Sequence, residues 1–388
     1  MSLVSHLFHG ELGDWCADRL TGSASVADDL FALIKDRSPI RPAGTVDRQH
    51  WDRASRTFAI RLATAVQAAP PYSSLLGLVR TGFVTRAWAD EQAIRYPTHA
   101  RLSAAQRGRA LDLRPAIDGW VDLGAARERG SAVMPAGSLE QAERWKMRPG
   151  LPDQPVLAEL FDRMRAYFWA HAPHGQLGEI GPETGLARLC WLLAAFEYVY
   201  RNDSSRHPLF QLFRDEPPTV RQLHAAADDE AIADPVALVR HVRECGAFDE
   251  LRRLAGDPPV GTPLGIAAPA IFDHWDDATF VLGGPDGTTL AEVTAAVAVD
   301  KGDRSTRRIW KLLASAWLDT DDAYRIRNVA IYFARYGALV TWPVEELEQR
   351  LLENGHAGDA RRAFVELAKR LRADDYARRL AYRETVEA

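Results

Sequence analysis

The last third of this chain carries the pattern that most restricts its fold. Two short apolar runs, an amphipathic helix and two more apolar runs follow one another between residues 271 and 350. Pro285 to Gly287 supply the turn between the first two runs, and Ser305 is a suitable N-cap for the helix. The predicted order is strand 280–284, strand 290–299, helix 305–318, strand 329–334 and strand 338–342.

The rest of the chain reads as mainly helical. Leu186, Phe196 and Tyr200 belong to a broad apolar stripe of the clearest helix, while Glu197 and Arg201, four residues apart, are spaced for an ion pair on its surface. Helices are predicted over 3–20, 25–37, 47–67, 154–171, 183–202, 219–227, 234–255 and 357–388.

These patterns together predict an α+β fold in which a sheet core flanked by helices is joined to a large, mostly α-helical region. The helix over 47–67 can be the first helix of that core, which makes the helical region after it an insertion. The expected divisions are N-terminal helices in 1–72, a helical region in 73–258, the α/β core in 259–352 and a charged helix in 353–388.

Composition narrows the functional classes. The net charge of −5 over 388 residues argues against binding nucleic acid through overall charge, so any such binding needs a local basic patch. Cys16, Cys190 and Cys245 are too far apart in sequence for a zinc motif, and so few cysteines are typical of a reducing compartment. The apolar run over 190–196 is too short to cross a bilayer, so we expect a cytoplasmic protein without a membrane partner.

Two acids flank the first predicted turn, Asp277 before the first strand and Glu292 on the second. An acid-bearing hairpin followed by a helix and another strand pair resembles the core of the PD-(D/E)XK nucleases, particularly their RecB-like and Cas4-like branch and nuclease-like proteins of actinobacteria. The segments 318–324 and 342–346 resemble the downstream part of that core. The resemblance implies phosphodiester cleavage that depends on Mg²⁺ or Mn²⁺ held by the two acids.

The chain departs from the family pattern at several positions. Thr279 stands where the first acid would lie, and Asp277, two residues earlier on the same strand face, can replace it. Thr294 stands in place of the motif lysine, and the Gln-x-x-x-Tyr element of the next helix is replaced by residues 311–315. Lys311, the first of these, is therefore a candidate to supply the missing ammonium group.

Three functional hypotheses follow. In the first, the site has decayed and the core only binds nucleic acid. In the second, the site has migrated and is active, with Asp277 and Glu292 as metal ligands and Lys311 as the third catalytic residue. In the third, the protein is a protein-binding scaffold. Each residue also has a structural interpretation: an acidic turn for Asp277, a surface strand for Glu292 and a solvated helix face for Lys311.

A group of basic residues at the start of the 305–318 helix is the candidate nucleic-acid contact, with DNA favoured over RNA. Salt bridges to Asp300 and Asp303 are the structural alternative for the same residues. The resemblance suggests a role in defence against mobile DNA or in DNA processing. The basic residues are Lys301, Arg304, Arg307 and Arg308.

Overall fold

The computed structural model describes residues 3–44, 46–100, 151–202, 207–272, 275–284, 286–299, 302–353 and 356–387. The chain forms two compact units. The first consists of Met1–Val46, His174–Leu177 and Ala237–Asp375, and the second of Asp47–Pro173, Gly178–Val236 and Tyr376–Ala388. Among the helices in these described stretches, none is long and apolar enough to cross a membrane.

The first unit contains a mixed sheet of five strands in the order β1-β4-β5-β6-β7. β5 pairs with β4 antiparallel and with β6 parallel, and the β5–β6 crossover contains α17 (Asp303–Leu318). A separate antiparallel pair is formed by β2 and β3. The strands are β1 (Gly265–Ala267), β2 (Ala270–Phe272), β3 (Asp276–Asp277), β4 (Phe280–Leu282), β5 (Thr288–Thr294), β6 (Ile326–Phe333) and β7 (Ala338–Pro343).

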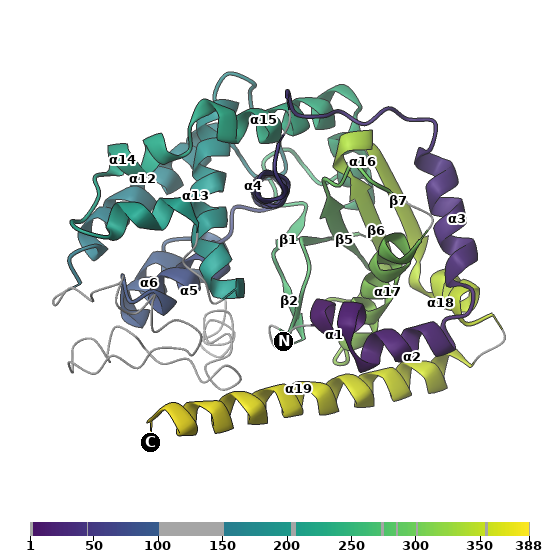
Figure 1. Cartoon of the computed structure of the whole chain (residues 1–388). Coiled ribbons are helices and arrows are strands. Elements are labelled where there is room, and N and C mark those ends of the chain that lie inside the picture. The colour runs from purple at the N-terminus through teal and green to yellow at the C-terminus, as the bar shows by residue number, and fades with distance from the viewer. Residues whose placement is uncertain are drawn as a thin grey trace. The chain divides into compact units, whose positions relative to one another are not determined.

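The two faces of this sheet are covered by different helices. Val329 and Ile331 of β6 belong to the same buried cluster as Leu312 and Trp317 of α17, so α17 packs on that face (Figure 1). Tyr332 points to the opposite face because side chains alternate along a strand, and there it meets the end of α15. The other helices of this unit are α1 (Leu3–His9), α2 (Glu11–Arg19), α3 (Ser23–Ile34), α16 (Ala247–Leu254) and α18 (Val344–Leu352).

The second unit is helical and has its own buried core. Its longest helices, α4 and α13, are joined by two ion pairs, Arg61 with Glu183 and Arg56 with Glu197. Glu197 is therefore bound by an arginine of another helix, which the spacing to Arg201 did not predict. The helices are α4 (Arg48–Val66), α5 (Tyr72–Arg80), α6 (Arg86–Ile94), α7 (Pro97–Ala100), α12 (Gln154–His171), α13 (Glu183–Asn202), the 3₁₀ helix η1 (Pro208–Phe213) and α14 (Val220–Ala226).

Two helices contribute to both units: α15 (Asp229–Glu244) and α19 (Ala357–Glu387). The structure confirms the mixed α and β class and the predicted element order from β4 to β7. The single helices predicted over 3–20 and 234–255 were wrong, because the chain breaks at Gly10 and at the left-handed Gly246. The short strands β1, β2 and β3 were not predicted, since two or three residues are too few to show a period of two.

Candidate functional site

The candidate site begins with a cross-strand pair on the α17 side of the sheet. Because Phe280 lies opposite Ala291, the preceding Thr279 lies opposite Glu292. The Thr279 hydroxyl donates a hydrogen bond to Glu292 Oε2 at 3.3 Å. The same hydroxyl oxygen accepts one from the backbone N–H of Val293, also at 3.3 Å. Thr279 therefore orients Glu292 and ties β4 to β5.

Lys311 reaches this pair from α17. Its ammonium donates to Glu292 Oε1 and, at 3.0 Å, to the backbone carbonyl oxygen of Asp277. It also lies 3.5 Å from Oδ1 of Asp276. Three oxygen atoms from two strands therefore converge on one nitrogen. The Lys311 side chain is 15% exposed and that of Glu292 is 23% exposed, so the cluster reaches solvent on the Glu292 side.

Asp276 is the buried member of the cluster. Its side chain is 1% exposed, and neither carboxylate oxygen receives a hydrogen bond from any residue in the described stretches. Burial raises the pKa of Asp276 to about 6, although the Lys311 charge acts in the opposite direction. Ser315, one turn after Lys311, lies near enough to lower that pKa but outside hydrogen-bonding geometry. Asp276 is therefore an acid whose ionisation is disfavoured by its surroundings.

Asp277 contributes differently from the expectation. Its carbonyl oxygen accepts a hydrogen bond from the Lys311 ammonium, and the carboxylate of the neighbouring Asp276 lies 3.5 Å from the same nitrogen. The negative charge of Asp277 still helps to raise the Lys311 pKa. The residue predicted for this position from the sequence was Asp277, and in the structure the side chain of Asp276 also lies beside the ammonium. The signal for Asp276 is its position among apolar residues, Trp275 before it and Ala278 after it.

The charge of Lys311 is stable in this setting. Burial opposes the ammonium form, but Glu292 and Asp276 outweigh this effect and hold the pKa of Lys311 above its ordinary value. Lys311 therefore remains a cation at neutral pH and cannot act as a general base. Its chemical capacity is to neutralise negative charge, whether that of the clustered acids or that of a bound anion.

The basic residues at the start of α17 have different environments. Arg304 is exposed, whereas Arg307 and Arg308 are partly buried. The Arg307 guanidinium lies over the Phe8 ring of α1, 5.2 Å from its centroid. Lys301 lies outside the described residues. Arg304 is consequently the member of this group that most freely faces solvent.

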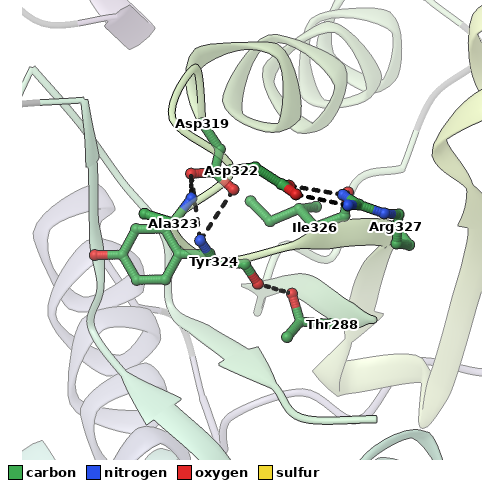
Figure 2. Close-up of polar contacts among 7 residues, drawn as sticks. All are labelled: Thr288, Asp319, Asp322, Ala323, Tyr324, Ile326 and Arg327. Carbon is green, nitrogen blue, oxygen red and sulfur yellow. Dashed lines mark hydrogen bonds and ion pairs between the residues drawn. The ribbon is translucent and has the colours of Figure 1, made fainter. Parts of the chain in front are cut away.

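The acids that follow α17 have structural partners (Figure 2). Asp319 accepts hydrogen bonds from the backbone N–H groups of Ala323 and Tyr324, and Asp322 forms a two-point ion pair with Arg327. The hydroxyl of Thr288 donates to the Tyr324 carbonyl oxygen at 2.6 Å, which joins this loop to the start of β5. These contacts fix the crossover that places Lys311 beside Glu292.

Comparisons with known proteins were made at three levels. The sequence matches no protein-family model, and no match was found among curated proteins or among solved structures. In the described parts of the chain, no group of three or more His, Cys, Asp and Glu side chains is arranged to hold a metal ion. The case for a function therefore depends on the Lys311 cluster and on the strand order around it.

Proposed function

We propose that this protein is nucleic-acid-associated and that its first unit is a degenerate, non-cleaving PD-(D/E)XK-like core. The strand order supports the likeness: β4 and β5 form a hairpin, α17 crosses over, and β6 pairs parallel with β5. Thr279 and Glu292, which occupy the positions of the two family acids, lie directly opposite each other on the face that α17 covers.

The position of the Lys311 ammonium carries the proposal. In the family pattern the converging acids hold a divalent metal. Here the ammonium makes hydrogen bonds to Glu292 and to the Asp277 carbonyl and lies beside Asp276, so a built-in cation stands among the oxygen atoms that would bind the metal. Thr279 and Thr294 add no charge to replace the missing acid and lysine. A metal would have to displace Lys311 from a partly buried ion pair, which is energetically costly.

Nucleic-acid association is supported by the basic start of the same helix. Arg304, Arg307 and Arg308 precede Lys311 on α17, and the exposed Arg304 is available to a phosphate group. The overall charge of −5 makes such a contact local, so binding should be moderate and strongly weakened by salt. DNA is the expected ligand, and defence against mobile DNA or DNA processing is the biological setting that the family resemblance suggests.

One observation favours the second hypothesis, an active metal-dependent nuclease. Asp276 is buried, lacks a hydrogen bond to the described residues and shares the cluster with two other acids, against the single charge of Lys311. The donor atoms are all oxygen, which Mg²⁺ and Mn²⁺ prefer, so Asp276, Glu292 and the Asp277 carbonyl would hold the ion if Lys311 moved aside. Such an ion would polarise a phosphate and activate water.

A binding and cleavage assay distinguishes these proposals. Purified full chain is incubated with labelled single- and double-stranded DNA and RNA, with Mg²⁺, with Mn²⁺ or with EDTA. The degenerate core predicts a gel shift without cleavage under all three conditions. Binding by Arg304→Ala should weaken and lose about one unit of its logarithmic salt slope. The matched control is Arg253→Ala, an exposed arginine of α16.

Two results would change the assignment. Metal-dependent cleavage that is abolished by Glu292→Ala and by Lys311→Met would establish the active nuclease instead. Failure to bind any of the nucleic acids, together with purification in complex with a protein, would support the scaffold hypothesis.

A further inference from the structure

A second group of reactive side chains lies on the opposite face of the sheet from Lys311. His241, in the last turn of α15, and Cys245, the residue after that helix, both approach Gly337, the residue before β7. A Cβ atom on residue 337 would lie 2.8 Å from Cys245 Sγ and 2.9 Å from His241 Nε2. The thiol sulfur and the imidazole nitrogen therefore both lie against the space that a side chain at position 337 would fill, and glycine is the residue that leaves room for both.

Neither side chain has a strong structural role that explains this arrangement. His241 Nε2 is buried and has no hydrogen-bond partner within the described stretches. Leaving such a buried polar atom unsatisfied is unfavourable, because it has lost its hydrogen bonds to water. The Cys245 thiol makes only long contacts, 3.7 Å to the Val242 carbonyl oxygen and 4.0 Å to the Tyr332 hydroxyl. A ligand that bound both atoms would remove the cost of the buried nitrogen.

Cys245 also differs from the other two cysteines. Cys16 and Cys190 are buried, and burial raises the pKa of both thiols well above the ordinary value. Cys245 is exposed, so solvent and dissolved ions can reach its sulfur. Among the three cysteines, Cys245 is therefore the accessible one.

We propose that His241 and Cys245 bind a single borderline or soft metal ion, with Zn²⁺ as the expected biological species. Residues four apart on a helix project from the same face, and imidazole nitrogen with thiolate sulfur is a donor set that zinc prefers to Mg²⁺. Because the described residues supply two protein ligands, water completes the coordination and the ion should exchange with solution. Tyr332 is a neighbour of the site, with its hydroxyl 4.0 Å from Cys245 Sγ.

This site is independent of the proposed function. Glu292 lies opposite Ile331 in the parallel β5–β6 pair, whereas the metal pair faces Tyr332, the next residue, on the other side of the sheet. The proposal of nucleic-acid binding can therefore fail while the metal site is present, and the metal site can be absent while nucleic acid is bound.

Titration of the reduced full chain with Co²⁺ tests the proposal, because a cobalt–thiolate bond gives a near-ultraviolet charge-transfer band. We expect saturation at one equivalent and competition by Zn²⁺. Cys245→Ser should abolish the band. His241→Ala should weaken binding at least about tenfold, because loss of a residue that only supports a metal ligand already lowers metal affinity by that factor. His356→Ala, at an exposed histidine, is the control and should leave binding unchanged.

A second measurement needs no substitution. Saturating Zn²⁺ should slow the alkylation of Cys245 by iodoacetamide at least about tenfold, as judged by peptide mass spectrometry, because a metal-bound thiolate is protected. Unchanged alkylation, or a cobalt band that survives in Cys245→Ser or is unaffected by His241→Ala, would overturn the site.

Discussion

Asp276→Asn tests the electrostatics of the Lys311 cluster most directly. The pKa of Asp276 rises from 3.8 to about 6 in the folded protein, mainly through burial. This difference in pKa means that the folded protein favours the protonated carboxyl group over the ionised one by about 3 kcal/mol more than the unfolded chain does. Because the folded-state pKa is raised, the contribution of Asp276 to stability is complete below pH 3.8 and is lost as the pH rises through 6. At pH 8 the buried carboxylate therefore destabilises the first unit.

Asparagine has nearly the same shape as the protonated acid and no charge at any pH. We therefore expect Asp276→Asn to stabilise the first unit by about 2–3 kcal/mol at pH 8 and to have little effect at pH 4. For a unit of this size such a gain raises the melting temperature by about 4–12 °C. Differential scanning calorimetry at pH 4, 5, 6, 7 and 8 is the suitable assay, since it can separate the transitions of the two units.

The control is Asp286→Asn, which removes an exposed acid from the turn between β4 and β5 and should leave the melting temperature nearly unchanged. The reasoning would be refuted if Asp276→Asn lowered the melting temperature at pH 8. That result would mean that attraction between Lys311 and the ionised Asp276 exceeds the cost of burying the carboxylate.

Other substitutions test other parts of the structure. Lys311→Met leaves the clustered acids without their cation and should destabilise the protein by about 3 kcal/mol at pH 8 in chemical denaturation, whereas Met at the exposed Lys369 should cost less than about 0.5 kcal/mol. Gly337→Ala should cost about 2 kcal/mol, because φ is +55° and the new Cβ would collide with a sulfur atom; an unchanged melting temperature would contradict the crowding at this turn. Arg61→Met should cost about 3–5 kcal/mol, because the buried Glu183 would lose its ion pair with Arg61, and calorimetry should show this loss in the transition of the second unit.

Local pattern was enough to predict most of the elements around the site. The apolar positions of α17 recur at helical spacing, and Ile309, Leu312, Leu313 and Trp317 are all buried as expected. The paired runs that became β6 and β7 are separated by a short turn that ends in Gly337. The helix and the strand pair depend on the order of neighbouring residues, so they can be predicted before any long-range contact is known.

Long-range packing decided which charged groups meet. Glu197 is bound by Arg56, 141 positions away in sequence, and Lys311 lies beside the side chain of Asp276. Cys245 and His241 likewise meet Gly337 only because α15 packs on the sheet. Helical and strand periods assign a side chain to a face of its own element, but the partner on that face depends on how separate elements dock. Amino-acid order therefore specified the helices and most strands, while tertiary packing selected the ion pairs and the atoms of both candidate sites.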